Sequence, residues 1–140
     1  MSLYLNASIL VALFVIDPSS SRAEAFLSAH PEIVVVSDFG VAEFSSAVGR
    51  RVRTGDLTRE DGQLAFCNFD NGSHDLHTGR RSRLPISTQQ LGFLRRLDIN
   101  LRTADAIHIA ISRRLGAALV TFDRSMAAGA RDLGIAIATP

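Results

Sequence analysis

Apolar residues occur in short runs that alternate with longer polar and mixed stretches. The run at residues 32–37 (EIVVVS) predicts a short strand of the buried, parallel-sheet kind. Residues 117–122 (AALVTF) and 135–139 (IAIAT) predict two further strands, and residues 4–8 (YLNAS) predict the first. Asn6 is out of place there, because it is a polar amide between two apolar segments that both look buried. Such a group needs a hydrogen-bonding partner or a function.

Helical stretches separate these strands, and Pro18 and Pro31 end the first two. Helices are expected at residues 8–17, 21–30, 38–53, 58–70, 87–97, 103–115 and 124–134. Residues 71–85 are polar and rich in Gly and Arg, so they are expected to be the least regular part. The alternation predicts an α/β fold with a central, mostly parallel sheet flanked by helices on both faces. A length of 140 residues predicts a single domain, residues 1–140.

Four polar residues are expected at one edge of this sheet. In parallel sheets the functional crevice lies beyond the carboxyl ends of the strands, and Asn6 and Asp123 each end a strand. Asp105 opens a helix that should run roughly 18 Å down the sheet. The next strand runs roughly 16 Å back, so Asp105 and Asp123 are expected at the same level. Glu43 lies in the second turn of the helix that follows residues 32–37. We call this predicted group the acidic rim.

The acidic rim predicts a metal site. Three carboxylates gathered at one place repel one another unless a cation neutralises them. Oxygen ligands without His or Cys favour a hard ion, Mg²⁺ or Mn²⁺. Such a site suits hydrolysis of a phosphodiester, because the metal activates water and stabilises the attacking and leaving oxygens.

Each acid also has an ordinary structural explanation. Asp105 lies in a first helical turn, where the helix dipole stabilises a negative charge. However, its helix is apolar nearly all round and should be buried, and a buried acid is costly without a partner. Asp123 suits a turn or the N-cap of the next helix. Glu43 points away from the apolar stripe of its helix and is expected to be solvated. His108 falls on an apolar stripe and is expected to be a hydrogen-bonded core histidine rather than a ligand.

The composition excludes two classes of protein. All 15 basic residues are arginine, which argues against a phosphoacceptor signalling domain because that chemistry relies on a lysine. No G-x-x-x-x-G-K-[ST] loop occurs, nor a G-x-G-x-x-G after a strand, so nucleotide-binding folds lack their motifs. The net charge of +1 provides no global attraction for nucleic acid. Local arginine clusters remain, with solvated faces as the default interpretation: Arg50, Arg51 and Arg53, and Arg80, Arg81 and Arg83.

Cysteine usage and hydropathy predict a cytoplasmic protein without a membrane segment. Cys67 is alone, which excludes an intramolecular disulfide and fits a reducing compartment. Residues 3–16 have the length of a signal-peptide core, yet no basic residue precedes them, Asn6 interrupts them, and they are too short to span a bilayer. Cys67 could form a nucleophile pair with His74 or His77, but nothing in the sequence orients these side chains, which argues against such a pair.

Four stretches resemble the PIN-domain ribonucleases, specifically the VapC/FitB-type toxins of bacterial toxin–antitoxin pairs. They are YLNASILVALF, VSDFGVAEFSSAVGRR, LRTADAIHIAISRRLGAALVTFDRSMAAGARDLGI and IAIATP. They cover nearly the whole chain in the family's order and spacing, and residues 54–85 match least. The resemblance implies a PIN fold, RNA cleavage that depends on Mg²⁺ or Mn²⁺, a homodimer and a cognate antitoxin.

The resemblance also implies roles for individual residues. Carried over by position, the acidic site consists of Glu43, Asp105 and Asp123, with Ser8 and Thr121 as polar support. Asn6 stands where the family has an aspartate that would share the principal ion with Asp105. An amide oxygen coordinates Mg²⁺ less strongly than a carboxylate. Losing outer-shell support alone costs ~10–100-fold at metal sites, so the loss of a ligand's charge should cost at least that.

Two functions therefore compete. The first is a metal-dependent ribonuclease toxin, weakened or inactive in this form, with Arg50, Arg51 and Arg102 as candidates to position the RNA backbone. The second is a catalytically dead PIN-fold binding module that dimerises and binds an antitoxin. Asn6 favours the second function, and the three intact acids favour the first. Metal affinity distinguishes them.

Overall fold

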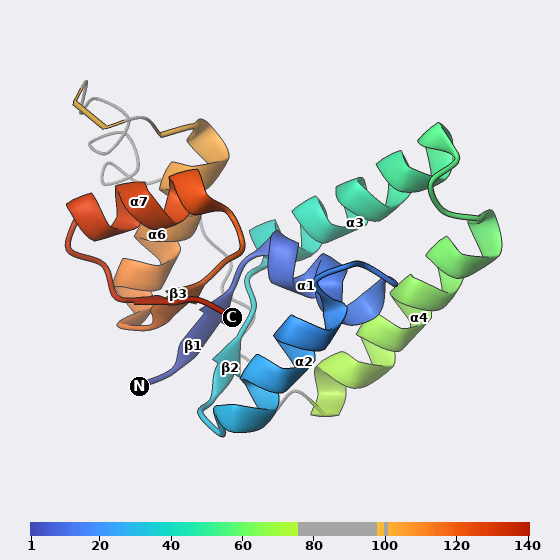
Figure 1. Cartoon of the computed structure of the whole chain (residues 1–140), viewed down its shortest axis with the longest axis horizontal. Helices are drawn as coiled ribbons and strands as arrows, with labels where there is room; N and C mark the ends of the chain where they lie inside the picture. The colour runs from blue at the N-terminus through green and yellow to red at the C-terminus, as the bar shows by residue number, and fades with distance from the viewer. Residues whose placement is uncertain (76–97, 100) are drawn as a thin grey trace.

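The computed structural model describes residues 1–75, 98–99 and 101–140 (Figure 1). Within these residues four strands form one parallel sheet in the order β2-β1-β3-β4. The strands are β1 (Leu3–Leu5), β2 (Val34–Val35), β3 (Ala118–Val120) and β4 (Ile137–Ala138). In the register of the sheet, Leu3 of β1 stands opposite Val34 and Ala118. The predicted parallel sheet is therefore confirmed, although each strand is shorter than the sequence pattern indicated.

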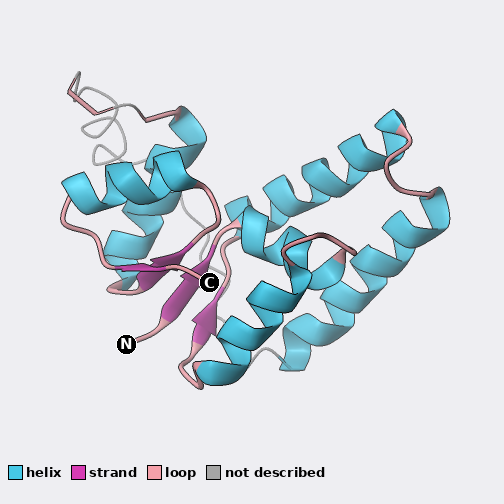
Figure 2. Ribbon diagram, in the orientation of Figure 1, coloured by secondary structure: helices cyan, strands magenta, loops and turns pink. Residues whose placement is uncertain are grey.

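Helices cover both faces of the sheet (Figure 2). One face carries α1 (Ala7–Phe14), α2 (Ser20–Ala29), α3 (Asp38–Thr54) and α4 (Arg59–Asp75), and the other carries α6 (Thr103–Leu115) and α7 (Arg124–Asp132). The helix expected at residues 87–97 lies outside the described residues. Among the helices that the structure describes, none is long and apolar enough to cross a membrane.

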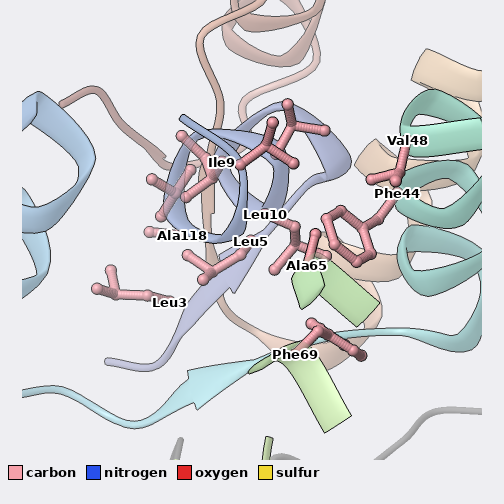
Figure 3. Close-up of a cluster of buried hydrophobic side chains, with 12 residues drawn as sticks. Leu3, Leu5, Ile9, Leu10, Phe44, Val48, Ala65, Phe69 and Ala118 are labelled. Carbon is pink, nitrogen blue, oxygen red and sulfur yellow. The ribbon is translucent and has the colours of Figure 1, made fainter. Parts of the chain in front are cut away.

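The side chains of β1 alternate between two buried clusters. Leu3 and Leu5 point into the cluster beneath α1, α3 and α4, where Phe44 and Phe69 are also buried (Figure 3). Tyr4 points to the opposite face and packs with residues of α6 and α7. Successive side chains of a strand face opposite ways, so a strand with helices on both sides reads as a continuous apolar run.

The junction between β1 and α1 differs from the expected one. The sequence pattern predicted a strand over residues 4–8, but β1 ends at Leu5 and α1 begins at Ala7. Asn6 is the N-cap of α1, with an extended backbone. Its side chain accepts a hydrogen bond from the helix as soon as the strand ends, which leaves no room for further strand residues.

Helix α4 also differs from the expectation. It continues to Asp75, although residues 71–75 were expected to be irregular. Phe69 packs edge-to-face against Phe14 of α1, and a Cβ at Gly72 would lie 3.3 Å from the ring of Phe14. Tertiary packing against α1 therefore extends α4 through residues of poor helix propensity.

Helix α7 approaches the segment before α6 closely. A Cβ added at Gly129 would lie 2.5 Å from Cδ2 of Leu101, so Leu101 would have to move. A glycine inside a helix costs about 1 kcal/mol relative to alanine. Here the missing side chain allows the two segments to touch.

Replacing Phe44 with alanine should lower the free energy of unfolding by about 3–5 kcal/mol, since the ring is fully buried and contacts other aromatic rings. Leu64→Ala is the matched control, because this side chain is 57% exposed, and it should change stability by less than about 0.5 kcal/mol. Urea unfolding measures both. Equal effects would contradict the described core.

Candidate functional site

Asn6 lies buried at the carboxyl end of β1. Its Oδ1 accepts hydrogen bonds from the backbone N–H of Ser8 at 3.1 Å and from the Ser8 hydroxyl at 2.6 Å. Its Nδ2 points to Sδ of Met126 on α7, 3.6 Å away. Only 3% of Asn6 is exposed. The amide therefore has hydrogen-bonding partners, and they tie the end of β1 to the starts of α1 and α7.

Ser8 and Thr121, the expected supporting residues, lie on either side of this junction. The Ser8 hydroxyl accepts a hydrogen bond from the N–H of Phe122 at 3.1 Å, which joins α1 to the end of β3. Thr121 is buried, and its hydroxyl accepts from the N–H of Asp123 at 3.0 Å. Both hydroxyls thus brace the backbone beside Asn6.

Asp123 is the N-cap of α7, which was one of its two ordinary explanations. Its Oδ1 accepts from the N–H groups of Ser125 at 2.8 Å and Met126 at 3.0 Å. Met126 also contacts Asn6, so Asp123 and Asn6 adjoin the first turn of the same helix. Asp123 is exposed.

Asp105 lies in the first turn of α6 and is only 6% exposed. Its Oδ2 accepts the backbone N–H of Arg102 at 3.0 Å. The helix behind it is buried as expected, with His108, Ile109 and Ile111 almost fully enclosed. A buried carboxylate that is held by a neutral backbone donor is costly, which is consistent with a ligand-binding role.

Glu43 is 32% exposed, so it reaches solvent as expected, but its Oε2 also lies 2.5 Å from Nε2 of His108. His108 is fully buried and hydrogen-bonded, as expected of a core histidine. Its bond to Glu43 was not predicted from the sequence. The one available signal was spacing, because His108 follows Asp105 by one helical turn and so shares its face.

The candidate residues form two connected groups. Asn6, Ser8, Thr121 and Asp123 are joined through the first turns of α1 and α7, and Glu43 is joined to α6 through a histidine. Over residues 1–75, 98–99 and 101–140, no three His, Cys, Asp or Glu side chains lie close enough to hold a metal ion. The candidate ligands are side-chain oxygens, the atom type that a hard divalent ion prefers. Because residue 6 is asparagine, the candidate residues carry one negative charge fewer than they would with an aspartate at that position.

The arginine candidates differ in their surroundings. Arg51 donates to Asp17 Oδ2 at 2.7 Å, and this hydrogen bond holds the pKa of Asp17 below its usual value. Arg50 is exposed and lines a groove of about 280 Å³ that also contains Ser8 and Phe122. Arg102 is exposed, and its backbone N–H binds Asp105. The cluster Arg80, Arg81 and Arg83 lies outside the described residues, as do His77 and the side chain of His74.

A sequence profile of the PIN domain matches residues 3–132, so the chain belongs to the PIN domain family. A relative from Mycobacterium tuberculosis, ribonuclease VapC46, is 32% identical over 143 residues that cover 99% of this chain and 98% of the relative. The resemblance to VapC/FitB-type PIN proteins that the sequence indicated is thereby confirmed.

Solved structures share the fold at low sequence identity. VapC20 of Mycobacterium tuberculosis, described as a toxin that cleaves the sarcin–ricin loop, has a TM-score of 0.68 at 18% identity and covers 99% of both chains. FitAcB from Neisseria gonorrhoeae also has a TM-score of 0.68, at 17% identity over 98% of this chain and 95% of that one. VapBC2 from Rickettsia felis, bound to a DNA fragment from its promoter, reaches 0.66 at 16% identity over 100% and 99%.

The ion pair between Asp17 and Arg51 predicts a pH-dependent contribution to stability. Because the folded state lowers the pKa of Asp17, the contribution is present above the unfolded pKa of about 4 and is lost as the pH falls through the folded pKa. Asp17→Asn should cost about 0.5–1 kcal/mol at pH 7 and nothing in strong acid. Urea unfolding measures this cost at several pH values from about 2 to about 7, a range that spans the reference pKa of aspartate. Asp132→Asn, an exposed control, should lack this loss, and a cost for Asp17→Asn that persists in acid would contradict the ion pair.

Proposed function

We propose that this chain is a metal-dependent endoribonuclease toxin of a toxin–antitoxin pair, with its activity weakened or abolished by Asn6. The observation that carries the proposal is the burial of Asp105 in the first turn of α6 with a backbone N–H as its partner. The full-length similarity to ribonuclease VapC46 supports the reaction class. The buried acid and the similarity to a ribonuclease both support hydrolysis of RNA.

The acidic rim would hold Mg²⁺ or Mn²⁺ through Asp105 and the Asn6 position, with Glu43 and Asp123 completing the pocket. A divalent cation bound there supplies an activated water and neutralises the charge that develops on the phosphodiester. Ser8 hydrogen-bonds Asn6 Oδ1 and so fixes the direction in which that oxygen points. Thr121 accepts the backbone N–H of Asp123, and the N–H groups of Ser125 and Met126 orient the carboxylate.

Arginines beside the rim would position the RNA backbone. Arg50 lines a groove that also contains Ser8, the residue that hydrogen-bonds Asn6, which supports Arg50 as a candidate for binding phosphate. Arg51 is paired with Asp17, which lowers the net positive charge it offers to phosphate. Arg102 precedes the buried Asp105 by three residues, and its backbone N–H binds that carboxylate. Guanidinium groups suit this task because they bind phosphate oxygens in a bidentate manner.

The proposed partners are a cognate antitoxin and a second copy of the chain. The similar structures FitAcB and VapBC2 are described as complexes by their names, and VapBC2 is bound to promoter DNA. Their similarity in fold supports an antitoxin for this chain.

The alternative is a catalytically dead PIN-fold module that dimerises and binds the antitoxin. Asn6 favours this alternative, because it makes the same helix-capping hydrogen bonds that an aspartate would make while bringing no charge. The fold would then be retained without the metal affinity.

Asn6→Asp should create or strongly increase RNA cleavage. Aspartate caps a helix as well as asparagine does, so the fold should be unchanged, and the parent should be at least ~10–100-fold slower. Cleavage of a mixed RNA pool in Mg²⁺ or Mn²⁺, with and without EDTA, measures this. Asp105→Asn in the Asn6→Asp chain is the matched control and should remove the cleavage again. If neither parent nor variant cuts RNA while both bind an antitoxin, the binding-module function replaces this proposal.

Arg50→Ala should weaken RNA binding by the Asn6→Asp chain about uniformly across sequences and reduce the slope of log K against log salt by about 1, as for the loss of one phosphate contact. Binding is measured by fluorescence anisotropy in Ca²⁺ at several salt concentrations. Arg131→Ala is the control, since Arg131 is exposed in the last turn of α7, far along that helix from Asp123. Equal effects of the two substitutions would contradict a specific role for Arg50.

A further inference from the structure

A buried chain of hydrogen bonds runs from α3 through β1 to α6 and back to Glu43. The Ser37 hydroxyl at the N-cap of α3 lies 2.8 Å from the Tyr4 hydroxyl, which lies 2.7 Å from Nδ1 of His108. Nε2 of His108 lies 2.5 Å from Oε2 of Glu43. Tyr4, Ser37 and His108 have no exposed surface. The chain therefore ends at the one member that reaches solvent, the Glu43 carboxylate.

The hydrogens in this chain point in one direction. Ser37 Oγ accepts the N–H of Gly40 at 3.0 Å, and its other hydrogen-bonding partner is the Tyr4 hydroxyl, so the serine hydrogen is satisfied when it is donated to Tyr4. Burial raises the pKa of the Tyr4 hydroxyl above its usual value, so the phenol stays protonated, and with its oxygen accepting from Ser37 it donates its hydrogen to Nδ1 of His108. A neutral histidine that accepts at Nδ1 carries its hydrogen on Nε2.

The opposite direction fails on hydrogen-bond satisfaction. With Nδ1–H donating to Tyr4 and Tyr4 donating to Ser37, the serine hydrogen has no acceptor among the described residues. A bare Nε2 would then face a carboxylate oxygen. In the described part of the chain every buried side-chain nitrogen and oxygen has a partner, and buried polar groups are nearly always satisfied. The Nε2–H tautomer meets this condition with each donor matched to one acceptor.

The imidazole ring is held firmly in place. It lies 5.1 Å from the ring of Phe39 and 5.7 Å from that of Tyr4, centroid to centroid. A Cβ at Gly40 would lie only 3.9 Å from Cε1 of His108. Glu43, in contrast, has a flexible side chain that is one-third exposed. Its hydrogen bond to a fixed ring removes much of that freedom.

We infer that His108 is a positioning residue for Glu43. The Nε2–H of His108 holds one carboxylate oxygen of Glu43, so that the other oxygen is presented to a divalent cation. This inference rests on the proposed function, which makes Glu43 part of the metal site. Both ring nitrogens of His108 are engaged and buried, so the histidine acts through Glu43 and does not itself bind the ion. Partners of this kind orient metal ligands, and their loss typically costs ~10–100-fold in metal affinity.

The direction of the hydrogen bonds is tested without any metal. A long-range ¹H–¹⁵N correlation spectrum of the parent chain at neutral pH reports which nitrogen of His108 carries the hydrogen, with His108→Gln assigning the signals. A single Nε2–H tautomer is expected, and Tyr4→Phe should leave it unchanged because Glu43 still accepts from Nε2. A predominant Nδ1–H tautomer in the parent would overturn the inference.

The positioning role is tested in the Asn6→Asp chain by titrating Mn²⁺ alone in a calorimeter and by measuring RNA cleavage. His108→Leu fills the core but removes the donor, so Mn²⁺ affinity should fall by ~10–100-fold. His108→Gln places an amide N–H near the position of Nε2 and should recover most of the affinity. His30, whose Nδ1 bonds Phe26 on α2, supplies matched controls: His30→Leu and His30→Gln should both bind Mn²⁺ as the parent does.

Thermal melting shows whether each variant is folded, which separates a loss of folding from a loss of positioning. If His108→Leu does not fold, the Mn²⁺ affinity of His108→Gln decides whether the positioning role holds. Unchanged Mn²⁺ affinity in a folded His108→Leu chain overturns the positioning role and leaves the proposed function intact. If the Asn6→Asp chain with an intact His108 neither binds Mn²⁺ nor cuts RNA, the proposed function itself fails and His108 has no metal ligand to orient.

Discussion

The parallel pairing of β1 with a strand on each side is the constraint on which the candidate site depends. Because β2, β1 and β3 run in one direction, the chain leaves all three at the same edge of the sheet, and α1, α3 and α7 begin there. Each of these helices is capped by a side-chain oxygen, from Asn6, Ser37 and Asp123 in turn. Two of these caps, Asn6 and Asp123, are also members of the proposed metal site, so the oxygens that satisfy the first N–H groups of α1 and α7 are also the ones assigned to the ion in that proposal.

This double use explains how position 6 can lose its charge without harm to the fold. As a helix cap, asparagine is as good as aspartate, and the Asn6 oxygen makes the two hydrogen bonds to Ser8 that a carboxylate would make. As a ligand of a hard cation the two residues differ, because only aspartate brings a charge. The substitution therefore separates the structural task of this position from its chemical task.

The order of the described elements and the parallel sheet were predictable, because hydrophobic periodicity is a property of local sequence. The N-cap position of Asp123 after β3 was predictable in the same way. The partner of Glu43 was not, because its contact with His108 joins side chains 65 residues apart and depends on how α3 and α6 pack. The extent of α4 was missed for a similar reason, since Phe69 and Gly72 pack on Phe14. The capping role of Asn6 required knowing that β1 stops at Leu5. Local pattern thus gave the framework, and contacts between distant elements set the details of the site.

The close approach at Gly129 has a consequence for mutational scanning. Any side chain there must displace Leu101, the neighbour of the residue whose N–H holds Asp105. A substitution at this glycine would thus be transmitted to a buried acid through two adjacent residues of the backbone. In a selection for loss of activity in the Asn6→Asp chain, Gly129 would therefore be a sensitive position although it offers no atom to a substrate. Its sensitivity would report the spacing between α7 and the segment before α6, so a map of sensitive positions would overstate the size of the proposed site unless that spacing is taken into account.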